Sequence, residues 1–274
     1  MTTAAITTRT RAVPAAAKRP GLPGALRSEL TKIRSVRSTY WTLLAQAVAS
    51  IAWAVLDCAG TLSHGIGPGF SATEASLTGQ VALGELIIVV LGALVITSEY
   101  STGMIRTSLA VVPRRGVLYA AKAIVFAAVT LTISLVTSFV AFFVGQAILS
   151  SKHYNTTLGQ PGVLRAVLLS AAIVTVFGLL AYGTGALIRH SAGAITSILG
   201  VIFLIPALAQ ALPNTWFADV VRWLPGGEAL SPIARSGPPL SPHLFGAWGE
   251  FAVFSGYAVV LLALGAWSFL RRDA

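Results

Sequence analysis

The segment 79–116, GQVALGELIIVVLGALVITSEYSTGMIRTSLAVVPRRG, contains both kinds of sequence from which this chain is built. Residues 79–97 form an apolar run, and about 20 such residues span the hydrocarbon core of a bilayer as a helix. Residues 98–116 are more polar and end in Pro-Arg-Arg-Gly. An apolar run that gives way to a short polar connection is typical of a protein that crosses the membrane several times.

Apolar runs of this length occur six times in the 274 residues. Hydrophobic residues make up 55% of the chain and charged residues only 10%, whereas soluble domains have about a quarter charged residues. Backbone N–H and C=O groups find no partner in hydrocarbon, so spans of this length must be helices. We therefore predict an all-α polytopic membrane protein with six transmembrane helices, at about 40–61, 79–97, 117–149, 163–188, 193–212 and 247–270.

These spans form one predicted transmembrane domain, residues 25–274. The third run is longer than a bilayer needs, so we expect it to tilt or to extend beyond the membrane. Residues 1–24 are rich in Ala, Thr and Pro and lack the apolar core of a signal peptide. We predict that they form a disordered cytoplasmic tail.

The positive charges fall mainly on one side of the predicted spans. Residues 1–39 contain eight Lys and Arg residues against one acid, and the loop 62–78 contains no Lys or Arg. The next loop and the C-terminus are basic again, at Arg106, Arg114, Arg115, Arg271 and Arg272. Because cytoplasmic loops carry the excess of Lys and Arg, both termini are predicted to be cytoplasmic. The rule holds on balance but not everywhere. Three cations fall in loops assigned to the outside, Lys152, Arg222 and Arg235. This topology explains the net charge of +10, so no nucleic-acid partner is predicted.

Two shorter helices are predicted at the membrane surfaces. From Ala25 onwards, Leu26, Leu30 and Ile33 recur at helical spacing, with Arg27, Lys32 and Arg34 away from that face. This pattern predicts an N-terminal amphipathic interfacial helix on the inner leaflet; the alternative is a solvated basic segment that only sets the topology. Before span six, Phe217, Val220 and Leu224 predict a short amphipathic helix in the outer segment.

The sequence lacks the signatures of an enzyme. The four histidines lie in different loops without the i, i+4 spacing that places two metal ligands on one helical face. A phosphate-binding loop of the form G-x-x-x-x-G-K-[ST] is also missing, and the segment 224–228, LPGGE, is interpreted as a turn. No catalytic, cofactor-binding or metal-binding residue is therefore predicted.

Three acidic residues lie within or near the predicted spans, at Asp57, Glu85 and Glu250. A carboxylate at membrane depth costs roughly 2.5 to 3.5 kcal/mol on insertion scales. We expect Asp57 and Glu85 to lie towards the outer ends of spans one and two, where a side chain can reach the headgroups. The alternative is that the three residues line a substrate path.

The polar segment after Thr97 is expected to form a short cytoplasmic helix. Ser98 is predicted to cap it, with Glu99 in its first turn, where the helix dipole favours a carboxylate. One face is apolar, because Ile105, Leu109 and Val112 recur at i, i+4, i+7, and Pro113 is expected to end the helix near Val112. Glu99, Gly103 and Arg106 share another face. That face is suited to a soluble partner, unless the segment is an ordinary connector between two spans.

Residues 97–122, TSEYSTGMIRTSLAVVPRRGVLYAAK, resemble the coupling segment of the permease subunits of type-2 ABC exporters. The family pattern of an acid, a glycine, and then Leu, Pro, Arg and Lys falls here at Glu99, Gly103, Leu109, Pro113, Arg114 or Arg115, and Lys122. The likeness extends over the whole chain, from the basic interfacial helix through six spans with both ends inside to a helical outer segment. Residues 26–41, LRSELTKIRSVRSTYW, are similar to the start of permeases from GC-rich, actinobacterial-like genomes, and fifteen Arg against four Lys agree with such an origin.

The resemblance implies a permease subunit in a bacterial cell membrane, without enzymatic activity or a cofactor of its own. It implies a separate ABC ATPase subunit on the cytoplasmic side and a second permease chain, identical or related. The residues implied in ATPase coupling are Glu99, Gly103, Met104, Arg106, Pro113, Arg114 and Arg115. Met104 departs from the commoner Thr of the family. The residues alone also fit an ATPase-independent secondary transporter or another polytopic protein, and more distantly an intramembrane enzyme.

Overall fold

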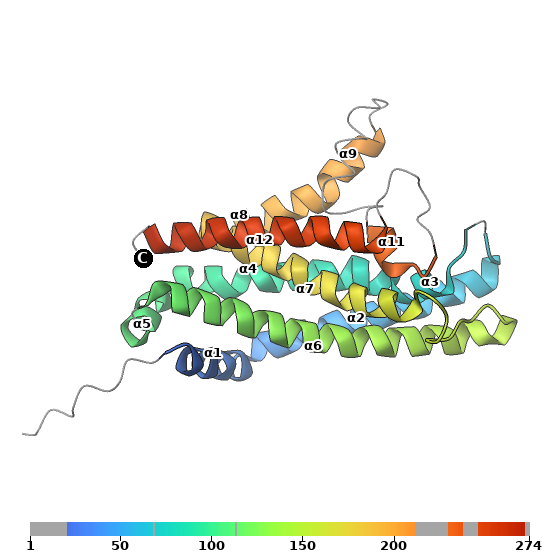
Figure 1. Cartoon of the computed structure of the whole chain (residues 1–274), viewed down its shortest axis with the longest axis horizontal. Helices are drawn as coiled ribbons and strands as arrows, with labels where there is room; N and C mark the ends of the chain where they lie inside the picture. The colour runs from blue at the N-terminus through green and yellow to red at the C-terminus, as the bar shows by residue number, and fades with distance from the viewer. Residues whose placement is uncertain (1–20, 68, 113, 212–229, 238–245, 272–274) are drawn as a thin grey trace, which may run out of the picture.

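The fold is an all-helical bundle whose long helices run along one common direction (Figure 1). The computed structural model describes residues 21–67, 69–112, 114–211, 230–237 and 246–271, and every structural statement below concerns these residues. Its first half comprises α1 (Leu22–Ser35), α2 (Arg37–His64), α3 (Ala72–Gly79), the π-helical turn η1 (Gln80–Gly84), α4 (Glu85–Ser101) and α5 (Met104–Val111). Its second half comprises α6 (Arg115–Leu149), η2 (Ser150–Lys152), α7 (Val163–Ile188), α8 (Ser191–Leu199), the π-helical turn η3 (Gly200–Leu204), α9 (Ile205–Ala211), α11 (Ser231–Ala234) and α12 (Ala247–Arg271).

The described residues contain six helices long and apolar enough to cross a membrane, which confirms the predicted number of spans. Their bounds are Arg37–His64, Ala72–Ser101, Arg115–Lys152, Val163–Ile188, Ser191–Leu208 and Ala247–Arg271. The third is the longest, at 38 residues. The second begins at Ala72 instead of Gly79, because Ser71 caps α3 by accepting a hydrogen bond from the backbone N–H of Glu74. Thr73 and Ser76 of this added part are completely buried. Because both residues are polar by type, hydropathy excludes them from the predicted span.

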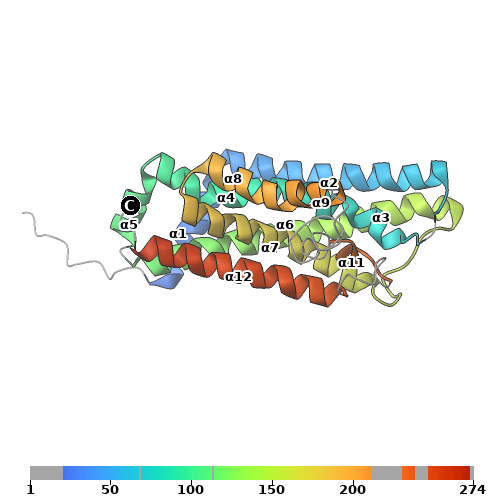
Figure 2. The same ribbon diagram turned by 90° about the horizontal axis from the view of Figure 1, so that it is seen from above.

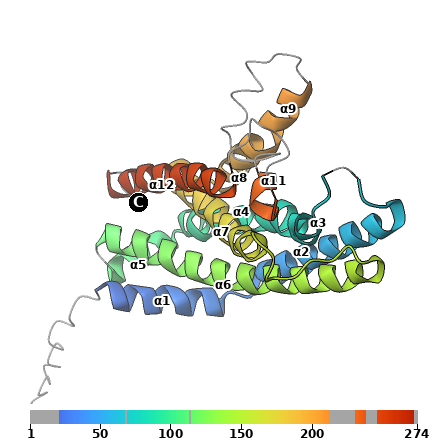
Figure 3. The same cartoon turned by 45° about the vertical axis from the view of Figure 1, so that its right-hand side comes forward.

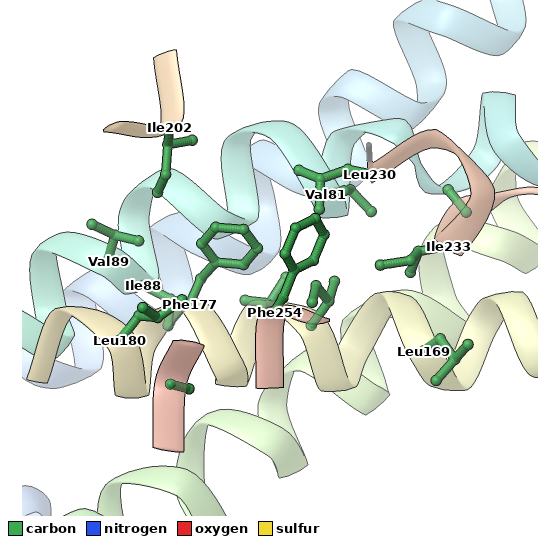
Figure 4. Close-up of a cluster of buried hydrophobic side chains, with 14 of the residues drawn as sticks. Val81, Ile88, Val89, Leu169, Phe177, Leu180, Ile202, Leu230, Ile233 and Phe254 are labelled. Atoms are coloured by element: carbon green, nitrogen blue, oxygen red, sulfur yellow. The ribbon is translucent and has the colours of Figure 1, made fainter. Parts of the chain in front are cut away.

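The centre of the bundle is α7, which packs against α4, α6 and α12 (Figure 2). Its apolar core includes Phe177 of α7 and Phe254 of α12, with ring centroids 5.8 Å apart (Figure 4). α4 and α7 cross where two glycines meet: a Cβ added at Gly92 would lie 2.2 Å from the carbonyl oxygen of Gly178. Small residues at a crossing let membrane helices approach closely, so these glycines set the α4–α7 spacing.

The two ends of the bundle contain different helices. α1, α5, the start of α6 and the end of α12 lie at one end, while α3 and α11 lie towards the other (Figures 1 and 3). This arrangement agrees with six successive crossings in alternating directions. The predicted outer helix around Phe217 and residues 1–20 of the predicted tail lie outside the described residues.

The N-terminal helix is present, but its buried face differs from the predicted one. α1 lies beside the first part of α6 and buries Ala25 and Glu29, whereas Leu26 is only half-buried (Figure 3). Lys32 was expected to point away from the apolar face, and this prediction is wrong, since Lys32 turns inwards to ion-pair with Glu29. The placement of α1 on the membrane surface stays a prediction.

Candidate functional site

The turn between α4 and α5 corrects the predicted start of the short helix. Ser98 and Glu99 belong to the last turn of α4, and α5 begins only at Met104. Gly103 breaks the helix because it adopts a left-handed conformation, with φ of 70°, which costs a glycine little and other residues more. The carbonyl of Ser98 accepts bonds from the N–H and hydroxyl of Thr102, so Ser98 acts at the end of one helix and does not cap the next.

The faces of α5 agree in part with the predicted ones. Ile105 and Val112 are buried and Leu109 is half-buried, which confirms the apolar face. Met104 and Arg106 are exposed, and Gly103 is open as well, since an added Cβ would meet nothing within 4 Å. Gly103, Met104 and Arg106 are thus all exposed at the start of α5, and together they are defined here as the α5 face.

The residues that follow α5 differ in exposure. Pro113 lies outside the described residues, while Arg114 is exposed and Arg115 is half-buried at the start of α6.

Glu99 is not part of the α5 face, because it is buried in a network of four charged side chains. The ammonium of Lys122 lies 2.7 Å from a carboxylate oxygen of Glu99 and 2.7 Å from one of Glu29. Lys32 lies 2.8 Å from Glu29 and 3.1 Å from Glu99, and it also donates to the hydroxyl of Ser108 at 3.0 Å. The expectation that Glu99 shares a face with Gly103 and Arg106 is wrong, because the helix ends between them.

This network, Glu29, Lys32, Glu99 and Lys122, joins three helices directly and a fourth through Ser108. Glu29 and Lys32 belong to α1, Glu99 to α4 and Lys122 to α6, and Ser108 adds α5. Two anions meet two cations, so the cluster is neutral. Glu29, Glu99 and Lys122 are each at most 5% exposed. Charges buried this deeply are tolerated when they are paired and hydrogen-bonded, so the network holds the four helices in one arrangement.

Glu29 and Lys32, the two members of the network on α1, are kept ionised by their partners. Burial by itself raises the pKa of Glu29, but the charge and hydrogen bonds of Lys122 and Lys32 outweigh it and hold the pKa of that carboxyl below its ordinary value. Burial likewise lowers the pKa of Lys32, but the hydrogen bonds and charges of Glu29 and Glu99 raise it above its ordinary value. Both side chains are therefore charged at neutral pH.

A second set of contacts ties the end of α4 to α7 and α12. The guanidinium of Arg189 lies 5.0 Å from the ring centroid of Tyr100, and it donates to the carbonyl of Ser268 at 3.1 Å. Arg189 itself has a left-handed backbone, with φ of 60°, at the end of α7. The last turn of α4 is thus connected to α6 through Lys122 and to α7 and α12 through Arg189.

The acidic residues of the spans are placed far from the α5 face. Asp57 lines a cavity of about 380 Å³ with Glu74 and Arg235. Glu250 is buried in the first turn of α12. Glu85 is completely buried, so the expectation that its side chain reaches the headgroups is wrong. The reason is the earlier start of the second span at Ala72, which moves Glu85 to the middle of a 30-residue helix.

Sequence reasoning did not assign a role to Glu29 or Lys32. One signal was present: Glu29 and Lys32 are spaced i, i+3 on one helix, and Lys122 follows the start of an apolar span by only a few residues. Their pairing could not be derived, because Lys122 lies 93 residues from Glu29 in the chain.

A family model described as ABC-2 family transporter protein matches residues 25–210, which include most of α1, all of α5 and the charged network. No match was found among curated proteins.

Proposed function

Because this chain belongs to the ABC-2 family of transporter proteins, we propose that it is the permease subunit of an ATP-driven export system. A multi-pass membrane protein of a transporter family supplies the translocation path. It carries no phosphate-binding loop of the Walker type, so ATP hydrolysis belongs to a separate subunit. Two copies, or this chain and a related one, form the complete path.

The observation that carries the proposal is the α5 face and its attachment. Gly103, Met104 and Arg106 are exposed at the end of the bundle where α1 lies and α12 ends, a position at which a soluble subunit can contact them. Directly behind this face, Ser108 of α5 bonds to Lys32, and Lys32 pairs with Glu99 of α4. A displacement of α5 by a partner therefore moves α4 and α1 as well.

The transmission of that displacement follows from the packing. α4 crosses α7 at Gly92 and Gly178 with almost no space between the backbones, so α4 cannot bend into α7 and must shift as a unit. Lys122 links the same network to α6. ATP binding and release at a docked subunit would thus move α1, α4 and α6 together, and with them the membrane path.

Copurification with ATPase activity tests this function. The tagged chain, extracted in mild detergent from its native cell, is expected to carry an ATPase subunit and to be present in two permease copies per complex. The chain purified alone should hydrolyse no ATP, and the copurified complex should. ATP turnover by the isolated chain after removal of contaminating ATPases, or a native complex without any ATPase, would contradict the proposal.

The orientation forms part of the same proposal, since the ATPase must lie on the side of α5. We expect both termini and α5 in the cytoplasm of a bacterial cell, because the basic residues concentrate there. A reporter active only in the cytoplasm should give signal when fused after Ala274 and none when inserted near Ser71. Signal from the reporter at Ser71 would contradict the proposed orientation.

A further inference from the structure

A cavity of about 220 Å³ lies within the membrane-spanning part of the chain, beside the middle of the second span. Its walls are mainly apolar and come from three separate segments, which contribute Val81, Ala82, Ile202, Phe203, Leu230 and Ala234. Figure 4 shows Val81 beside Leu230, and Ile202 on a separate segment. An apolar cavity with few polar groups is the usual form of a small-molecule site.

A fully buried acidic residue, Glu85, is among the residues that line this cavity. Glu85 is 0% exposed, and neither of its carboxylate oxygens has a hydrogen-bond partner among the described residues. The nearby amides do not supply one, since Gln46 donates to Gln80 at 3.0 Å and Gln80 donates to the carbonyl of Ser134. An ionisable side chain at membrane depth generally marks a functional site, because it is costly to keep there without a partner.

The helices on both sides of the cavity depart from regular α geometry at this level. Val81 and Ala82 belong to the π-helical turn η1, and Ile202 and Phe203 belong to the π-helical turn η3. Single π-helical turns are frequent at functional sites. Two such turns line this one cavity, which favours a functional role for it.

The other acid at this cavity is already neutralised. Glu74 pairs with Arg235 at 2.6 Å, and Arg235 also donates to the carbonyl of Gly69. Among the described residues that line this cavity, Glu85 is thus the acid that no cation contacts. Phe203 adds an aromatic ring, and aromatic faces attract cations.

We propose that this cavity binds a hydrophobic monocation, with the Glu85 carboxylate as its counter-ion and the apolar walls as the site for its hydrocarbon part. Such a compound is the substrate class of the permease, an inference that rests on the proposed export function. Entry from the lipid suits a compound that partitions into the bilayer, since the walls of the cavity are apolar.

Binding to the full-length chain in lipid nanodiscs, without ATP or an ATPase, tests this site. The probes are phenyltrimethylammonium and its neutral isostere tert-butylbenzene, which differ in charge but hardly in shape. The unmodified chain should bind the cation, Glu85→Gln should weaken that binding at least tenfold, and Glu85→Asp should retain most of it. Binding of tert-butylbenzene should change less than threefold in either variant.

A steric control separates the cavity from the charge. Ala82→Phe fills the cavity and should weaken binding of both compounds. Unchanged binding of the cation in Glu85→Gln, or equal losses of the two compounds in that variant, would overturn the proposal. Since no ATPase takes part, failure here leaves the coupling proposal standing, and failure of coupling leaves the binding result intact.

Discussion

Replacing Lys122 by Met should destabilise the protein by about 3–5 kcal/mol, the range found when one partner of a buried ion pair is removed. Lys122 contacts both carboxylates at 2.7 Å each, and it is more deeply buried than Lys32, which contacts them at 2.8 and 3.1 Å. Without it, Glu29 and Glu99 remain buried near each other with Lys32 as their only cation in the network. The measurement is the unfolding midpoint of the purified chain in detergent, together with its abundance in the membrane.

The double variant Lys122→Met, Glu99→Gln decides whether the charges act as a unit. It removes one anion and one cation, and it leaves the Glu29–Lys32 pair, which is neutral. At least half of the stability lost in Lys122→Met should therefore return, a coupling that a double-mutant cycle measures. Thr132→Val is the control on the same helix, since Thr132 is exposed and bonds only to the carbonyl of Ala128. Additive losses in the double variant would contradict the network.

Reversing the charge of Arg106 should lower transport and substrate-stimulated ATP hydrolysis together, by tenfold or more, at normal abundance. Arg106→Glu changes an exposed residue of the α5 face, so it should cost the isolated chain little stability. A like-charge contact across an interface costs several kcal/mol, which is sufficient for such a loss. Lys152→Glu is the matched control, because Lys152 is exposed at the end of the third span that lies away from α5.

Gly103 allows a second test of the same surface. Bulk at this position has open space within the chain, so Gly103→Leu should act on a docked partner, but it also strains a backbone with φ of 70°. Gly103→Asn separates the two effects, since Asn tolerates the left-handed conformation and is smaller than Leu. Coupling should be impaired more by Leu than by Asn. Normal transport in Arg106→Glu and Gly103→Leu at normal abundance would return α5 to the status of a connector.

The sequence was sufficient for the features that depend on local patterns. Six long apolar runs predicted six spans, and the spacing of Ile105, Leu109 and Val112 predicted the apolar face of α5. The predicted boundary between α4 and α5 is wrong, because Ser98 does not cap α5 and Gly103 is the residue at which α4 gives way to α5. A glycine just after a helix is the commonest left-handed terminator, so this signal was available.

Features that depend on distant residues could not be derived. The partners of Glu99 lie on α1 and α6, and nothing in a single sequence aligns those helices with the end of α4. The sequence predicts Glu85 near the outer headgroups, because the polar residues Thr73 and Ser76 indicate a loop where the helix in fact begins. Only the packed structure shows that these polar side chains are buried.

The contact between α5 and an ATPase subunit is the central claim, and site-specific photo-crosslinking measures it directly. A photoreactive amino acid at position 106, on the exposed part of α5, should crosslink the chain to a soluble ATPase subunit in intact membranes, and the same amino acid at position 152 should not. The ATPase identity follows from mass spectrometry of the crosslinked product and its Walker motif. A product at position 106 that contains only lipid or a second copy of this chain, with no ATPase, would contradict the account.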